Sequence, residues 1–294
     1  MTTELDLAYD YCQRVAKQNA RSFYYASLPL PRDKRRAIYA VYAYCRLCDD
    51  IADGDLPIDE KYRGFAEVRR NLQSSTTTGE DAQMYLALRH AAETFGIPYS
   101  YLDEILQGVE MDMVKTRFAD FDELREYCYK VASVVGLVCI RIFGYTDANA
   151  EEYAADMGLA LQLTNILRDV KEDIERCRVY IPQDEMRRFG YTEAELERGA
   201  MTDGFRALMA HQAQRAQEYY DRSRALFPLI AADARACPQL MHATYGGILE
   251  RIEQSGYNVF ERRIGLSKPE KLMLLARLGL SGLLSALSLR RAKR

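Results

Sequence analysis

The stretch Gln162-Leu-Thr-Asn165-Ile-Leu-Arg168-Asp169-Val-Lys-Glu172-Asp173 puts acidic and amide side chains into a segment that otherwise has the apolar periodicity of a buried helix. A second stretch of this kind, Asp49-Asp50-Ile-Ala-Asp53, lies about 120 residues earlier. A buried helix does not carry several carboxylates on its inner face unless a cation compensates their charge. The two stretches therefore predict helices that face a site for divalent metal and diphosphate.

Helical periodicity continues from these stretches along nearly the whole chain, and strand patterns are almost absent. The length of 294 residues allows one or two domains, but no Pro- or Ser-rich linker divides the sequence. We therefore expect one all-α domain over residues 1–294. Two spacings, Thr192-x-x-Glu195 and Ser267-x-x-Glu270, are typical of capping boxes. The helices expected besides 32–53 are 80–95, 98–117, 120–143, 148–175, 203–226 and 236–255.

Composition narrows the class of protein. The net charge of -3 gives no footprint for nucleic acid, so no nucleic-acid partner is expected. The first residues, Met1–Tyr9, include Glu4 and Asp6 and have no apolar run, which predicts a cytoplasmic protein with free thiols. Cys45 and Cys48 form an isolated CxxC pair, which we interpret as core residues because only three His are present to complete a zinc site.

The C-terminal residues 271–294 are apolar and end in a basic cluster. The apolar run after Arg277 has about a dozen residues, too few to span a bilayer unaided. Two interpretations stay open. The segment is either a helix that lies on the inner face of the membrane, with its basic end on anionic headgroups, or a last core helix with a solvated tail.

On a helix of about 100° per residue, the first stretch forms a ladder of polar groups. Tyr42, Arg46, Asp49 and Asp53 fall within about 60°, while Asp50 points about a quarter-turn away. At ~6 Å and an effective dielectric constant of ~20, two carboxylates one turn apart repel by about 3 kcal/mol. The alternative is a solvated acidic helix end, but the inward register favours Mg²⁺, with Mn²⁺ as a second choice.

The second stretch forms a similar ladder. Gln162, Asn165, Asp169 and Asp173 fall within about 80°, and Arg168 lies beside them. Amide and carboxylate oxygens suit a hard divalent cation. Arginine suits phosphate, because its planar fork matches the phosphate oxygens. Two such ladders in one helical chain predict a site for metal and diphosphate.

With these motifs the chain resembles the squalene/phytoene synthase family over nearly its whole length. The resemblance implies an all-α, single-domain isoprenoid synthase fold with its helices around a central cavity. Within the family, the motif sequences look most like those of bacterial hopanoid-pathway enzymes. The segments that carry the resemblance are Ser22-Phe-Tyr-Tyr25, Tyr42-Ala-Tyr-Cys-Arg46, Asp49–Asp53, Gly108–Met113, Tyr127–Ala132, Gln162–Asp173, Arg178-Val-Tyr-Ile-Pro182 and Tyr245.

The resemblance also implies roles for individual residues. Tyr127 matches a tyrosine that takes part in the chemistry, together with the four aspartates. Asn19 and Cys177 depart from the family pattern, which has His in some relatives at the first position and usually Gly at the second. The implied Mg²⁺ ligands are Asp49, Asp53, Asn165, Asp169 and Asp173, and the implied substrate contacts are Ser22, Tyr42, Arg46, Gln162, Arg168 and Tyr245.

The reaction implied is the Mg²⁺-dependent head-to-head condensation of two farnesyl diphosphates to presqualene diphosphate, and whether it goes on to squalene stays open. Alternatives are hydroxysqualene synthesis from presqualene diphosphate, phytoene or dehydrosqualene synthesis, and a non-catalytic scaffold. The complete aspartate ladders disfavour the scaffold. NADPH use stays open, because family members that use NADPH also lack a GxGxxG fingerprint. The sequence does not indicate the oligomeric state.

Overall fold

The structure, a computed structural model, describes residues 3–74, 76–267, 269–270 and 273–274, with only the backbone at 21 and 22. The all-α expectation is confirmed: β-pairing within these ranges is limited to two isolated bridges, Arg117 with Val179 and Tyr145 with Ile230. The helices in chain order are α1 (Glu4–Asn19), α2 (Arg21–Ala26), α3 (Arg32–Asp53), α4 (Ile58–Gln73), α5 (Ala82–Phe95), α6 (Tyr99–Met111), α7 (Phe121–Cys128), η1 (Tyr129–Ser133), α8 (Val134–Phe143), α9 (Ala150–Arg168), α10 (Val170–Glu175), α11 (Gln183–Arg188), α12 (Glu193–Glu197), α13 (Asp203–Ser223), α14 (Leu226–Leu229) and α15 (Ala236–Gln254).

Two of the expected helices are interrupted. The run expected over 120–143 contains the π-helical turn η1 between α7 and α8. The run expected over 148–175 breaks at Asp169, which ends α9 and precedes α10 with φ -102° and ψ 16°. The hydrogen bonds from Asp169 N to Asn165 O (2.9 Å) and from Asp173 N to Asp169 O (2.8 Å) continue across the break. The second ladder therefore bends at its central aspartate.

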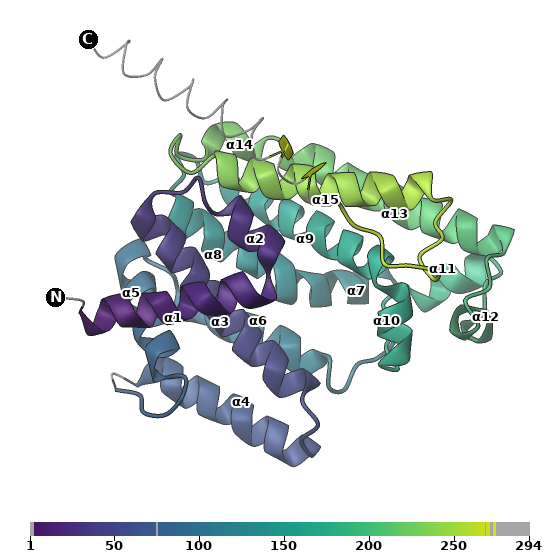
Figure 1. Ribbon diagram of the computed structural model, residues 1–294. Coiled ribbons are helices and arrows are strands. Elements are labelled where there is room, and N and C mark those ends of the chain that lie inside the picture. The colour runs from purple at the N-terminus through teal and green to yellow at the C-terminus, as the bar shows by residue number, and fades with distance from the viewer. Residues whose placement is uncertain (1–2, 75, 268, 271–272, 275–294) are drawn as a thin grey trace, which may run out of the picture.

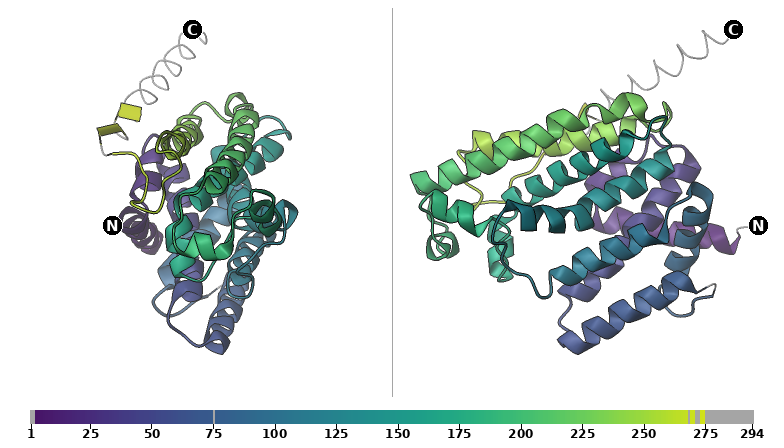
Figure 2. Two further views of the ribbon diagram at one scale, coloured as in Figure 1. Left: turned by 90° about the vertical axis from the view of Figure 1, so that its right-hand side faces the viewer. Right: turned by 180° about the vertical axis from the view of Figure 1, so that it is seen from behind.

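Helix α9 runs through the middle of the molecule and packs against α8, η1, α13 and α15 (Figure 1). Helices α13 and α15 lie side by side on one flank, while α4 covers the opposite flank (Figure 2). Two apolar clusters form the core. One is built around α1, α3, α5, α6 and α8, and the other around α7, α9, α13 and α15. Leu161 on α9 packs against both clusters, so this helix joins the two halves of the core.

Glycines allow α6, η1, α8 and α9, which together are called the wall around η1, to pack in close contact. A Cβ added at Gly158 would lie 2.5 Å from Ala132 O, and one at Gly136 would lie 2.7 Å from Ala154 O. A Cβ at Gly108 on α6 would lie 2.7 Å from Val131 Cγ1. No side chain fits into these contacts, so η1, α8 and α9 meet at closer range than ordinary helix packing allows.

The end of the described chain lies against α15. Ser267 N donates to the Glu270 carboxylate (2.8 Å), which is one half of the expected capping box, and Arg251 on α15 pairs with Glu270. The capping box Thr192–Glu195 is confirmed in full. The expected apolar-basic helix, 271–294, lies outside the described residues apart from 273–274. Among the residues described, no helix is both long and apolar enough to cross a bilayer.

Candidate functional site

A cavity of about 450 Å³ lies between the two core clusters and takes its lining from both. Most of the lining is apolar, including Phe23, Ile105, Val135, Phe143 and Met157. Its polar lining residues come from the two ladders and from segments that carry the resemblance. These are Tyr42 and Asp49 from α3, Asp112 after α6, Tyr127 from α7, Gln162 and Asn165 from α9, and Tyr245 from α15.

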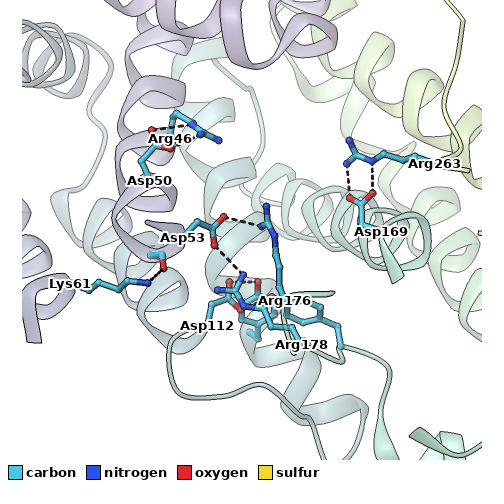
Figure 3. A network of polar contacts seen from close by, with 12 residues as sticks. Arg46, Asp50, Asp53, Lys61, Asp112, Asp169, Arg176, Arg178 and Arg263 are labelled. Carbon is cyan, nitrogen blue, oxygen red and sulfur yellow. Dashed lines mark hydrogen bonds and ion pairs between the residues drawn. The ribbon is translucent and has the colours of Figure 1, made fainter. Parts of the chain in front are cut away.

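The α3 ladder begins inside this cavity. Asp49 lines the cavity, and burial raises its pKa to about 7, with a further contribution from the negative charge of Asp53. Asp53 at the end of α3 accepts hydrogen bonds from Arg176 (3.0 Å) and Arg178 (3.2 Å), as Figure 3 shows. These pairs tie the end of α3 to the segment after α10.

Asp50, which the register places about a quarter-turn from the ladder, does not line the cavity. It is half exposed and pairs with Arg46, whose Nε lies 3.1 Å from Oδ2 (Figure 3). Arg46 was predicted to contact substrate, and in the structure its guanidinium is held at the edge of the acidic ladder by this pair. The paired arginine lies at the same end of α3 as Asp49 and Asp53.

The α9 ladder is held by arginines at its bend. Asp169 accepts a hydrogen bond from its neighbour Arg168 (2.8 Å to Nε). It accepts another from Arg263 (2.7 Å to Nε), as Figure 3 shows. Burial opposes the ionised form, but these two guanidinium groups lower the pKa of Asp169 overall. Asp173, one turn further, has no such partner among the described contacts. Burial and the charge of Asp169 raise the pKa of Asp173 to about 7.

The residues fit a hard divalent cation in their chemistry. Asn165 Oδ1 is buried and has no hydrogen-bond partner, as expected of an oxygen that would act as a ligand to a metal ion. Burial raises the pKa of Asp49 and of Asp173, so each needs a counter-cation to stay ionised. In the part of the chain that is described, no three His, Cys, Asp or Glu side chains meet in one metal-binding cluster. The ladders are separate pairs, so a shared bridging anion would complete the coordination.

A third acidic group, which sequence reasoning did not single out, lies between the ladders. Asp112 follows α6, lines the cavity, and influences the pKa of both Asp49 and Asp173. It accepts hydrogen bonds from Tyr127 (2.9 Å) and Tyr180 (2.7 Å). Both Asp112 and Tyr180 fall inside segments that matched the family pattern, so a signal existed, but helical register alone gave Asp112 no role.

The arginines around the site were only partly predicted. Arg168 was expected near phosphate, and it does lie in the ladder. Arg176 and Arg263 were missed because they belong to loops that follow α10 and α15, and no periodicity applies there. Ser22 lies in α2, and its side chain is outside the described part of the chain. Asn19 donates to Val15 O (2.9 Å) on α1, so its amide engages its own helix.

A family model described as squalene/phytoene synthase matches residues 16–270. The chain belongs to the squalene/phytoene synthase family. It is therefore a prenyltransferase of the group that joins prenyl diphosphates head to head, a family that typically depends on Mg²⁺.

Relatives in this family match this chain along most of their own length. The 15-cis-phytoene synthase of a Synechocystis strain is 35% identical over 91% of this chain and 83% of its own. The phytoene synthase of Mycobacterium tuberculosis is 36% identical over 93% and 91%. The expected fold is confirmed by a dehydrosqualene synthase crystal structure, with a TM-score of 0.86, 30% identity, and 96% and 98% of the two chains covered. Squalene synthase HpnC from Alicyclobacillus acidocaldarius follows, with a TM-score of 0.79, 28% identity, and 87% and 96% covered.

Proposed function

We propose that this squalene/phytoene synthase family member makes phytoene from two geranylgeranyl diphosphates, with no reductant. The observation that supports this choice of substrate is the sequence identity of 35–36% to phytoene synthases over more than nine-tenths of the chain. The motif sequences alone favour farnesyl diphosphate as the substrate, presqualene diphosphate as the product and a place in hopanoid synthesis. Phytoene synthesis, named there as an alternative, has the better support.

The site suits this reaction at both of its ends. At the polar end, Asp49, Asp53, Asn165, Asp169 and Asp173 would hold Mg²⁺, which when bound neutralises a departing diphosphate. The arginines that pair with the aspartates offer bidentate contacts to phosphate oxygens. At the apolar end, the cavity shields the allylic cation from water.

The carbon–carbon bonds form without a co-reactant besides the two substrates. The C2–C3 alkene of the second substrate attacks the allylic cation, and loss of a proton closes a cyclopropane. A second ionisation opens the ring, and loss of another proton leaves a central double bond. Proton loss, in place of hydride addition, is what separates the phytoene and dehydrosqualene products from squalene. Aromatic faces such as Tyr42 and Phe23, 5.4 Å apart by ring centroids at the cavity wall, stabilise nearby positive charge.

The test is a product assay. Purified protein is incubated with geranylgeranyl diphosphate or farnesyl diphosphate and Mg²⁺, with and without NADPH, and lipid extracts are analysed. We expect a C40 product from geranylgeranyl diphosphate that forms equally well without NADPH. A NADPH-dependent C30 product, or accumulation of presqualene diphosphate, would move the assignment to the squalene branch.

Substitutions in the ladders test the site itself. Asp49→Asn and Asp169→Asn should each lower turnover by at least about 10²-fold, since each removes a charge that holds the counter-ions of the leaving group. Far-UV circular dichroism should stay unchanged. Asp122→Asn, which changes an exposed carboxylate at the start of α7, is the matched control and should leave turnover unaltered. Full activity in either ladder variant would contradict the assignment of that ladder.

A further inference from the structure

Asp112 joins two phenols to the wall of the cavity. The Tyr127 hydroxyl donates to its Oδ2 (2.9 Å) and the Tyr180 hydroxyl donates to its Oδ1 (2.7 Å). The two phenol rings stack with their centroids 5.3 Å apart, and Phe118 packs against both at 5.4 and 5.8 Å. Such packing fixes the two rings, and the two hydrogen bonds direct both phenolic protons at the same carboxylate.

This orientation decides what the Tyr127 oxygen can do. Its single proton is directed at Asp112, so only lone pairs remain for any other partner. Tyr127 and Asp112 both line the cavity. Burial, followed by the negative charge of Asp112, raises the pKa of Tyr127 well above its usual value, so the phenol is neutral. A neutral phenol accepts a proton readily only if it passes its own proton on in the same step.

The surroundings of Asp112 suit an acceptor of that proton. Burial raises the pKa of Asp112, and hydrogen bonds from the two phenols and the charge of Arg178 only partly offset the effect. Arg178 is shared with Asp53 at 3.2 Å, so it does not neutralise Asp112 fully. A buried carboxylate with an incomplete counter-charge gains from protonation.

We propose, on the basis of the proposed function, that Asp112 is a positioning residue that orients Tyr127 and receives its phenolic proton when the substrate cation is deprotonated. The group that touches the substrate is Tyr127. Asp112 acts through it, and Tyr180 holds the second oxygen of the carboxylate in place.

The step balances without a further reactant. Ring closure breaks one C–H bond of the cationic adduct, and the electron pair of that bond forms the third side of the cyclopropane. The proton passes to the Tyr127 oxygen, while the phenolic proton passes to Asp112 Oδ2. The tertiary cation becomes neutral, the phenol is unchanged, and the carboxylate becomes a carboxylic acid. Nothing is oxidised or reduced.

The test compares Asp112→Asn, Tyr127→Phe and the double variant. The Asn side chain is isosteric and still accepts a hydrogen bond, but its amide cannot take up the proton. We expect Asp112→Asn to lower kcat about 10²-fold, a typical effect of general acid–base groups, with KM changed less than about twofold. The double variant should be no slower than the slower single variant, because residues that act as one unit lose their effect together.

Two further variants separate a relay from general packing. Tyr44→Phe removes a buried phenol that donates to Leu102 O, outside the cavity lining, and should leave kcat within about twofold. Asp112→Glu keeps a carboxylate and should recover at least about tenfold of the activity lost in Asp112→Asn. Losses that multiply in the double variant, or that appear in KM instead of kcat, would show that Asp112 only supports the structure and would overturn the relay.

A measurement on the unmodified protein keeps the relay testable if Asp112→Asn does not fold. Single-turnover ring closure should be slower in D₂O than in H₂O, because the exchangeable phenolic proton moves in that step. Equal rates in the two solvents would overturn the relay. A wild-type protein that forms no head-to-head product overturns the proposed function and the relay together. An active wild type with an unimpaired Asp112→Asn variant overturns the relay alone.

Discussion

Cys177 adopts a backbone conformation that favours glycine. Its φ of 60° lies in the left-handed region, and the residue follows α10 at the turn that leads to Arg178. The sequence departs from the family at this same position, where Gly is usual. The departure strains a turn, because a Cβ is disfavoured in this region by about 1–2 kcal/mol.

Cys177→Gly should therefore stabilise the protein by about 0.5–1 kcal/mol, after the larger chain entropy of unfolded glycine is deducted. The measurement is urea unfolding, read as a higher midpoint at unchanged slope. Cys177→Ala is the control, because it removes the exposed thiol and keeps the Cβ. An equal gain from both variants would assign the effect to the thiol, against the backbone explanation.

Single residues of the site could be predicted unevenly. Register assigned Asp49 and Asp53 to one face of α3 and left Asp50 outside it, as the structure shows. Helical register did not predict that Arg178 and Arg263 would reach the site, because their positions depend on how loops return to the helices. Long-range ion pairs of this kind follow from the tertiary fold and have no periodic signal in the sequence.

At the level of helices, α3 was predicted over Arg32–Asp53, the bounds that the structure shows. Its start after Pro31 and its end before Gly54 are strong local signals. The bend at Asp169 was not predicted, and neither was the π-helical turn η1, whose backbone lies against α6 and α9. A local pattern does not report such contacts.

The close contact between α9 and η1 makes a testable prediction. Gly158→Ala places a Cβ 2.5 Å from Ala132 O, so two backbones must separate, and overpacking of this kind typically costs about 1–3 kcal/mol. Gly246→Ala on α15 is the matched control, since no heavy atom lies within 4 Å of its added Cβ.

The control should be neutral or stabilising by up to about 1 kcal/mol, the helix propensity difference between Ala and Gly. Both are measured by urea unfolding. If Gly158→Ala proved as stable as Gly246→Ala, the wall around η1 would have to be more adaptable than its contacts indicate.

For the whole molecule, the sequence predicted an all-α isoprenoid synthase fold, and the confirmed fold is of that kind. The two ladders predicted one site for metal and diphosphate, but not how α3 and α9 pack to form its cavity. Around that site, arginines are already paired with three of the six carboxylates. The paired carboxylates are Asp50, Asp53 and Asp169, and their partners are Arg46, Arg168, Arg176, Arg178 and Arg263, while Asp49, Asp112 and Asp173 have no ion pair among the described contacts.

This balance predicts that metal and diphosphate stabilise the protein jointly. Mg²⁺ alone must displace arginines from the aspartates, and inorganic diphosphate alone is repelled by the carboxylates. Each ligand by itself should therefore change the melting temperature little. Together, at about 100 times the dissociation constant, they should add about 2.7 kcal/mol, or roughly 4–5 °C for a chain of this size. Differential scanning calorimetry measures the shift, and a chelator should abolish it. An equal shift from diphosphate in chelator would show recognition by arginine without metal.

The π-helical turn has a consequence at the level of the gene. A π turn carries one residue more than an α turn, so η1 amounts to a one-codon insertion within the helical run from Phe121 to Phe143. Because the π turn takes up that residue within one turn, deleting a single codon inside η1 would restore an α turn and keep α7 in register with α8. Deleting a codon from the α-helical residues of α8 would instead rotate α7 by about 100° relative to the rest of α8. The Tyr127 hydroxyl would then turn away from Asp112, although neither residue had been replaced. The place of a deletion along this helical run therefore matters to the site as much as the identity of a side chain.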